Sequence, residues 1–178
     1  MLVPARPSLL RGLKHSRLFI VATKTEVNMK VLFLHGLESK PGGSKAIRLQ
    51  GLGYEVLNPA LPKSSFPESV SIAQQVIDDE RPDVIVGSSR GGAVAMAVDR
   101  KGARLVLIAP AWKNYGIPPV VPSGTIILHS LADDIIPYED SQKIEGAQAV
   151  VPVGADHRMF DEEALSAIGT AVGGKFIN

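Results

Sequence analysis

The chain has 178 residues, 45% of them hydrophobic and 21% charged, which is enough to bury one core and is ordinary for a folded domain. A net charge of +1 gives no overall attraction to nucleic acid or to an anionic lipid surface. The chain has no cysteine, which excludes disulfides, zinc–thiolate sites, iron–sulfur clusters and cysteine nucleophiles. No apolar run approaches the roughly 20 residues of a membrane-spanning helix.

Residues 1–28 differ from the rest of the chain because they are basic and interrupted by proline. Their five cations face a single acidic residue, Glu26. The apolar stretch Leu18–Ala22 is shorter than the apolar region of a secretory signal peptide. One interpretation is a transit-type presequence that targets an organelle. We favour a dispensable extension, followed by a cytoplasmic domain of residues 29–178 that begins at Met29.

Short apolar runs alternate with helical patterns from Met29 onward. The runs predict six strands at Met29–Leu34, Tyr54–Leu57, Asp83–Val86, Arg104–Ala109, Thr125–His129 and Ala149–Val153. The helical patterns are Lys45–Gln50 with Ser44 as its cap, a segment opened by Pro67, Ala93–Val98, Glu139–Glu145, and a last helix opened by Asp161. The connection Pro110–Gly124 contains four prolines and no helical period. This alternation predicts an α/β fold with an open, doubly wound, mostly parallel sheet of about six strands.

Side chains that could take part in catalysis follow four of the predicted strands. His35 follows the first strand and Ser89 the third, whereas Asp133 and His157 come shortly after the fifth and sixth. Ligands of such sheets bind beyond the carboxyl ends of the strands. A nucleophile, a carboxylate and an imidazole are therefore expected at one edge of the sheet.

The segment Gly87–Gly91 matches the pattern G-x-S-x-G with Ser89 at its centre. A serine on a sharp strand-to-helix turn has a strained backbone, and residues beside it must be small to avoid the adjoining strand and helix. The pattern alone occurs often in a glycine-rich chain. Its position after an apolar strand and before a small-residue helix makes it specific.

Four segments together resemble the α/β-hydrolase superfamily, and in particular its small esterase-like members without a lid. They are FLHGLES, VIVGSSRGGAVAM, HSLADDIIP and VGADHRMF. The resemblance covers about residues 29–172 and implies a minimal α/β-hydrolase fold. The connection Pro110–Gly124 is too short for a cap domain.

The resemblance implies a Ser-His-Asp triad of Ser89 as nucleophile, His157 as general base and acid, and Asp133 as the residue that orients the imidazole. A serine hydroxyl needs a base to remove its proton, and the imidazole needs a carboxylate to fix its tautomer. The backbone N–H groups of Leu37 and Arg90 are the expected oxyanion hole. No cofactor and no metal are implied.

Five further residues have less specific interpretations. His35, Trp112 and Lys113 are candidates for the pocket, with His35 most often a brace for the oxyanion loop. His129 is interpreted as a hydrogen-bonded core residue within its strand. Ser130 occupies a position where the superfamily usually has glycine.

The expected function is hydrolysis of a small carboxylic ester through an acyl-enzyme intermediate. Thioester hydrolysis or another acyl transfer to water would use the same residues. A catalytically idle hydrolase-fold binding protein is a different class, and an intact Ser, His and Asp argues against it. A nucleotide-binding module with Gly87–Gly92 as phosphate cradle would leave His157 unexplained.

Overall fold

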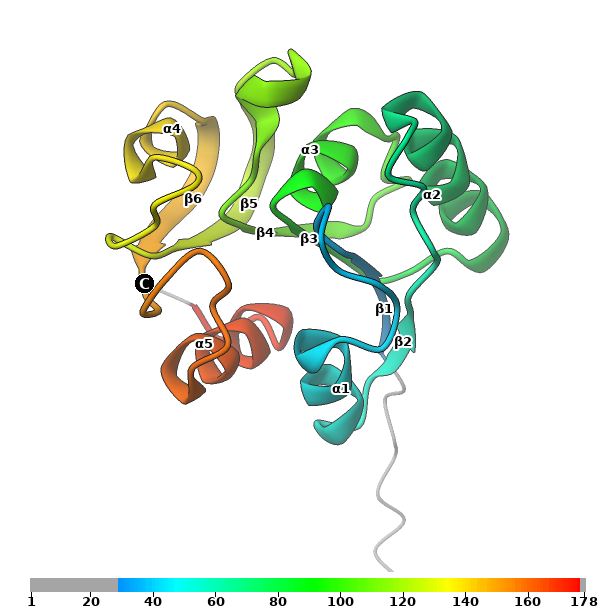
Figure 1. Ribbon diagram of the computed structural model, residues 1–178. Coiled ribbons are helices and arrows are strands. Elements are labelled where there is room, and N and C mark those ends of the chain that lie inside the picture. Colours follow the sequence, from blue (N-terminus) through cyan, green and yellow to red (C-terminus); the bar gives the residue numbers. More distant parts are fainter. Residues whose placement is uncertain (1–28, 177–178) are drawn as a thin grey trace, which may run out of the picture.

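The computed structural model describes residues 29–176, and within them six strands form one fully parallel sheet in the order β2-β1-β3-β4-β5-β6 (Figure 1). The strands are β1 Lys30–Leu34, β2 Glu55–Leu57, β3 Val84–Ser88, β4 Arg104–Ile108, β5 Val120–His129 and β6 Glu145–Pro152. The predicted α/β class and doubly wound sheet are confirmed. The predictions for residues 1–28 lie outside the described residues.

Helices cover both faces of this sheet, as Figure 1 shows. They are α1 Ser44–Gly51, α2 Phe66–Glu80, α3 Arg90–Ala97, α4 Tyr138–Gln142 and α5 Glu162–Val172, and a 3₁₀ turn, η1, spans Trp112–Tyr115. Helices α1 and α5 pack on one face, and α2 and α3 on the other. Among the described residues, no helix is long and apolar enough to cross a membrane.

Apolar side chains of alternating strand positions fill a layer on each face. Phe33 packs in the layer of Leu49 and Ile168, which come from α1 and α5. Its neighbour Leu34 packs in the opposite layer, which includes Ile77 of α2. Strands buried on both faces need apolar residues at every position. This is why the strands appear in the sequence as continuous apolar runs.

The first described strand, β1, lies between β2 and β3 and not at an edge of the sheet. From β1 the chain moves outward to β2 and then crosses back to β3 on the other side of β1. In open α/β sheets, the crevice at such a reversal, beyond the carboxyl ends of the strands, is the usual ligand site. The strands that precede His35, Ser89, Asp133 and His157 all end at this edge because the sheet is parallel.

The predicted cap of the first helix is wrong by one residue. Gly43 is the N-cap, with extended backbone and a carbonyl that accepts the N–H of Ile47 at 3.0 Å. Ser44 is the first helical residue. No side-chain cap bond is present at this helix start, so the sequence preference for serine caps does not apply here.

Other predicted boundaries are also wrong. The helix expected over Glu139–Glu145 ends at Gln142, because Glu145 begins β6 and its N–H donates to the carbonyl of Pro119 at 2.8 Å. The connection Pro110–Gly124 is not irregular throughout, since it contains η1 and the first residues of β5. Pairing with a distant strand determined these boundaries, and local helix propensity did not.

Candidate active site

Ser89 lies on the turn between β3 and α3 with φ 53° and ψ −117°, a conformation that L-residues rarely adopt. Two backbone hydrogen bonds hold this turn. The N–H of Ser89 donates to the carbonyl of Ile108 at 2.8 Å, and the N–H of Ala111 donates to the carbonyl of Ser89 at 3.0 Å. The end of β4 therefore fixes the strained turn from outside.

The glycines around Ser89 are required by close backbone contacts. A Cβ on Gly87 would lie 2.5 Å from the carbonyl oxygen of Gly91, and one on Gly91 would overlap the carbonyl of Leu34. A Cβ on Gly92 would lie 2.8 Å from Pro110. The requirement for small residues that the sequence pattern suggested thus has a steric cause in β1, β3 and the loop after β4.

The structure brings the three predicted triad residues into one chain of hydrogen-bond contacts. His157 Nε2 lies 3.1 Å from Ser89 Oγ, and His157 Nδ1 lies 2.7 Å from Asp133 Oδ2. The side chain of Asp133 is fully buried, whereas that of His157 is 14% exposed. With Nδ1–H donating to the carboxylate, Nε2 is free to accept the serine proton.

The carboxyl group of Asp133 is also held by backbone donors. Its Oδ1 accepts the N–H groups of Ile135 and Ile136 at 2.9 and 2.8 Å. Burial raises the pKa of Asp133, but these hydrogen bonds and the one from His157 outweigh it and leave the pKa below its ordinary value. The group therefore stays ionised at neutral pH. The neighbouring Asp134 is exposed.

The loop that carries His157 is tied to the end of β5 and to α5. Ser130 Oγ donates to the carbonyl of Gly154 at 2.7 Å, and the N–H of Ala155 donates to Asp161 Oδ2 at 3.0 Å. Asp161 also caps α5 through Ala164. Ser130 thus links the segment of the acid to the segment of the histidine, a contact that its departure from glycine could have suggested and that the sequence analysis missed.

Lys45 of α1 is a second contact to this loop that the sequence analysis missed. Its buried ammonium donates to the carbonyl of Arg158, the residue after His157, and lies 4.4 Å from the centre of the Phe160 ring. Burial lowers the pKa of Lys45 to about 8, although Asp156 and Asp161 oppose this shift. Three elements, α1, β5 and α5, therefore hold the position of His157.

The predicted oxyanion donors belong to two segments that meet at the nucleophile: Arg90 follows Ser89 directly, and Leu37 follows Gly36 in the loop after β1. A Cβ on Gly36, the residue before Leu37, would lie 4.0 Å from Ser89 Oγ, so this loop packs against the serine. In the described part of the chain, neither the N–H of Leu37 nor that of Arg90 has a hydrogen-bond acceptor. Their catalytic role stays a prediction.

His35 lies within the same loop and is 4% exposed. Its Nε2 accepts the N–H of Leu61 at 3.2 Å, so the ring proton is on Nδ1, which lies 2.9 Å from the carbonyl of Gly36. This arrangement joins the loop after β1 to the loop after β2. It is the geometry of a brace.

The side chain of Arg90 is buried and binds the segment that leads from β2 into α2. One terminal nitrogen donates to the carbonyls of Pro62 and Ser65 and to Ser69 Oγ, at 2.8 to 3.0 Å. The guanidinium carbon also lies 5.8 Å from the centre of the Phe66 ring and 5.9 Å from that of the Tyr115 ring. These two rings stack on each other. Arg90 thus connects the turn of Ser89 to the start of α2 and to η1.

Trp112 and Lys113 direct their polar groups toward α4. Trp112 Nε1 donates to the carbonyl of Asp140 at 3.0 Å, and Lys113 Nζ lies 3.5 Å from Asp140 Oδ1. The structure does not bring either nitrogen into the hydrogen-bond chain of Ser89. Their expected contribution to a pocket stays a prediction.

Comparisons with known proteins support the same fold. No protein-family model and no curated protein matches the chain. Among solved structures, alpha/beta hydrolase domain-containing protein 10 from mouse is similar at a TM-score of 0.63 and 16% identity, covering 81% of this chain and 88% of that one. A putative hydrolase of the alpha/beta superfamily from Xanthomonas campestris pv. campestris reaches 0.58 and 23% identity, covering 81% and 95%. An esterase domain from Rhodothermus marinus reaches 0.61 and 17%, covering 85% and 87%.

These similarities show the fold. The chain has the α/β-hydrolase fold in a small form, with a six-stranded parallel sheet and a short connection after β4.

Proposed function

We propose that this protein is a serine hydrolase that cleaves a small carboxylic ester through an acyl-enzyme intermediate. The observation that carries the proposal is the continuous contact chain from Ser89 Oγ through His157 to the buried Asp133, with distances of 3.1 and 2.7 Å. These contacts supply a nucleophile, a base and an orienting carboxylate in the order that acyl transfer requires.

The reaction proceeds in two steps, acylation of Ser89 and hydrolysis of the acyl-enzyme. Ser89 Oγ attacks the ester carbonyl while His157 Nε2 takes the hydroxyl proton, and His157 then gives that proton to the leaving alkoxide as the C–O bond breaks. Water attacks the resulting acyl-serine while His157 Nε2 takes its proton, and His157 then returns that proton to Ser89 Oγ as the acyl–Oγ bond breaks and the acid leaves. The N–H groups of Leu37 and Arg90 stabilise the oxyanion in both steps.

The surface around Ser89 supports a substrate with an apolar substituent. Large apolar side chains are exposed on the loops that carry the proposed catalytic groups: Leu37 is 38% exposed, Ile135 62% and Leu131 71%. An apolar acyl or alkyl group that covers them would remove this area from water, which is favourable. A thioester of the same acyl group would use the same residues.

Fluorophosphonate labelling tests the proposal. The probe phosphonylates an activated serine, and peptide mass mapping identifies the modified residue. We expect labelling at Ser89 and complete loss of labelling in Ser89→Ala. Ser88→Ala is the matched control, because it removes the hydroxyl of the buried residue directly before Ser89; it should keep the label.

Hydrolysis of p-nitrophenyl acetate, butyrate and octanoate, alongside the matching thioesters, then measures the preferred acyl group. Labelling at Ser88, or no labelling of a chain shown by circular dichroism to be folded, would contradict the proposal.

A further inference from the structure

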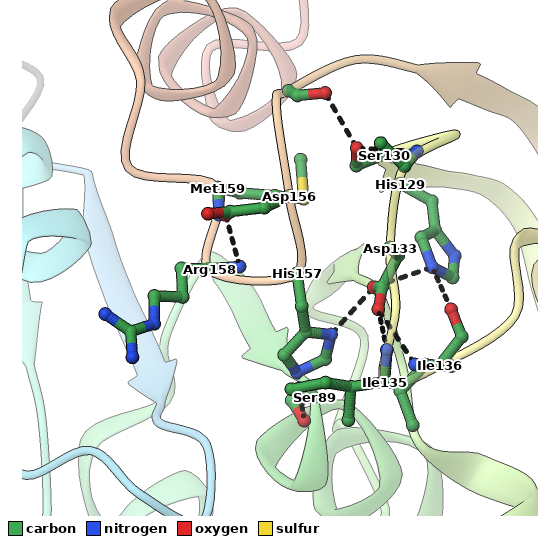
Figure 2. Close-up of polar contacts among 12 residues, drawn as sticks. Ser89, His129, Ser130, Asp133, Ile135, Ile136, Asp156, His157, Arg158 and Met159 are labelled. Carbon is green, nitrogen blue, oxygen red and sulfur yellow. Dashed lines mark hydrogen bonds and ion pairs between the residues drawn. The ribbon is translucent and has the colours of Figure 1, made fainter.

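His129 makes a second contact with the carboxylate of Asp133, on the side away from His157 (Figure 2). It is the last residue of β5, and its side chain is fully buried. Its Nε2 lies 3.0 Å from Asp133 Oδ2 and 3.0 Å from the carbonyl oxygen of Ile136. Its Nδ1 lies 2.7 Å from Oγ of Ser141, which is fully buried in α4.

The partners of His129 determine where its proton lies. The carbonyl of Ile136 can only accept a hydrogen bond, so Nε2 carries a proton that it shares between that carbonyl and Asp133 Oδ2. In the neutral ring, Nδ1 carries no proton and accepts a hydrogen bond from the hydroxyl group of Ser141. Burial lowers the pKa of His129, and the opposing effects of Asp133 and the Ile136 carbonyl are smaller. The neutral Nε2–H form therefore holds near neutral pH.

The carboxylate of Asp133 thus accepts four hydrogen bonds. Oδ2 accepts from His157 Nδ1 and His129 Nε2, and Oδ1 accepts from the N–H groups of Ile135 and Ile136. Donors on both oxygens fix the plane of the carboxylate. Because His129 and His157 share Oδ2, a stronger bond from one weakens the bond from the other.

The two Ser–His pairs on Asp133 differ in access. Ser141 and His129 are fully buried, whereas His157 is partly exposed and reaches Ser89 at the open edge. The buried pair cannot meet a substrate. Its contribution must therefore pass through Asp133.

We propose that His129 is a positioning residue of the triad: its Nε2–H orients the Asp133 carboxylate toward His157 and moderates how strongly that carboxylate stabilises protonated His157. This inference rests on the proposed function and goes beyond it, because it assigns a task to a residue outside Ser89, His157 and Asp133. The charged groups near His129 are Asp133 and, when protonated, His157; the Tyr138 ring from α4 packs against it edge-on.

Two matched substitutions separate positioning from simple packing. A glutamine amide nitrogen reaches the place of the histidine Nε2, whereas an asparagine amide reaches only that of Nδ1. His129→Gln therefore keeps a donor toward Asp133, and His129→Asn keeps a polar partner for Ser141 but removes that donor. A purely structural role would affect both variants alike, apart from differences in stability.

We expect kcat/KM on p-nitrophenyl acetate to fall roughly 10- to 100-fold in His129→Asn, because a misplaced acid disturbs the alignment of the base. His129→Gln should stay within about threefold of the unsubstituted chain. The acid limb of the kcat/KM profile should move to higher pH by about half a unit in His129→Asn, since Oδ2 then holds protonated His157 more strongly. Equal activities of the two folded variants, with an unmoved acid limb, would overturn the inference.

Nuclear magnetic resonance gives a test that does not depend on activity. Long-range ¹H–¹⁵N spectra of the unsubstituted chain should show His129 protonated at Nε2 and unprotonated at Nδ1. The chemical-shift titration of His157 should move to higher pH in His129→Asn and stay in place in His129→Gln. The opposite His129 tautomer, or an unmoved His157 titration, would overturn the inference even if the chain fails to hydrolyse esters. Absence of labelling and hydrolysis in the unsubstituted chain contradicts only the proposed function.

Discussion

The two edges of the sheet differ in the side chains that they present: one edge has a cavity, and the other has the candidate catalytic residues. At the amino edge, a cavity of about 510 Å³ lies between the starts of β4 and β5 and the end of α5. At the carboxyl edge, Ser89, His157 and Asp133 meet beside exposed apolar side chains. This cavity and the candidate catalytic residues thus lie at opposite edges of the sheet.

The cavity at the amino edge is lined by residues whose donors serve the fold. Arg104 donates to the carbonyl of Val172 at 2.6 Å, and Arg100 donates to the carbonyl of Ala103 at 2.6 Å. Its described lining contains no histidine and no carboxylate. Ser123 and Thr125 line this cavity, but without a neighbouring base their hydroxyl groups are not activated for acyl transfer.

Topology explains this difference. In a parallel α/β unit, each strand leads into a loop at the carboxyl edge, and the helix that follows begins there with free N–H groups. Ser89 stands at such a junction, between β3 and α3. The direction of the strands, and not the volume of a cavity, therefore locates the candidate site.

The largest effect is expected from the acid of the proposed triad. Asp133→Asn should keep the fold but lower kcat by about 10³- to 10⁴-fold, because the amide no longer enforces the tautomer of His157. Asp134→Asn, the matched control at the exposed neighbour, should change kcat by less than about tenfold. Both variants are measured on p-nitrophenyl butyrate after circular dichroism. A large loss of kcat in Asp134→Asn, with an unchanged kcat in Asp133→Asn, would refute the assignment of Asp133 as the acid.

The next effect concerns packing beneath Ser89. Gly91→Ala should lower the free energy of unfolding by about 3 kcal/mol or more, since its Cβ would overlap the carbonyl of Leu34 and rigid backbone must move. Gly43→Ala is the control, because its Cβ would meet its nearest atom at an ordinary 3.7 Å. Urea unfolding measures both. Equal stability of the two variants would show that the turn is not as tightly packed as described.

A smaller effect is expected from the buried cation beside the His157 loop. The pKa of Lys45 is about 8 in the folded chain, against an ordinary 10.5, so between these values the unfolded chain binds more protons. The free energy of unfolding should therefore rise with pH across this interval by on the order of 2 kcal/mol from this group.

Lys45→Met should lack that increment, and Lys63→Met should keep it, because Lys63 is exposed and pairs with Glu38 at the surface. Urea unfolding at four values from pH 7.5 to 10.5 gives the measurement. A Lys45→Met variant with the same pH dependence as the unsubstituted chain would refute the contribution of Lys45.

The smallest effect is expected from the removal of residues 1–28, which precede β1 in the sequence. A chain that starts at Met29 should keep kcat/KM within about twofold and its melting temperature within a few degrees, because the described sheet and all proposed catalytic groups follow that residue. Differential scanning calorimetry and an esterase assay test this. A fall in melting temperature above about 10 °C would instead indicate that Leu18–Ala22 forms part of the core.

Local sequence determined most of the fold and the identity of the proposed catalytic residues. Continuous apolar runs predicted the parallel sheet because strands buried on both faces tolerate little else. The glycines of the five-residue segment Gly87–Gly91 indicated that the backbone beside Ser89 has no room for a side chain. Motif order then placed Asp133 and His157 after later strands, and the structure brings both to Ser89.

Contacts between distant segments were decided by the tertiary structure alone. Lys45 and Arg158 are 113 positions apart, and Ser130 and Gly154 are 24 apart, so no local pattern connects them. His129 was predicted as a hydrogen-bonded core residue, yet its bond to Asp133 depends on how the loop after β5 turns back. A sequence gives residue types and local periodicity, whereas a hydrogen bond depends on direction and distance, which exist only once the segments pack together.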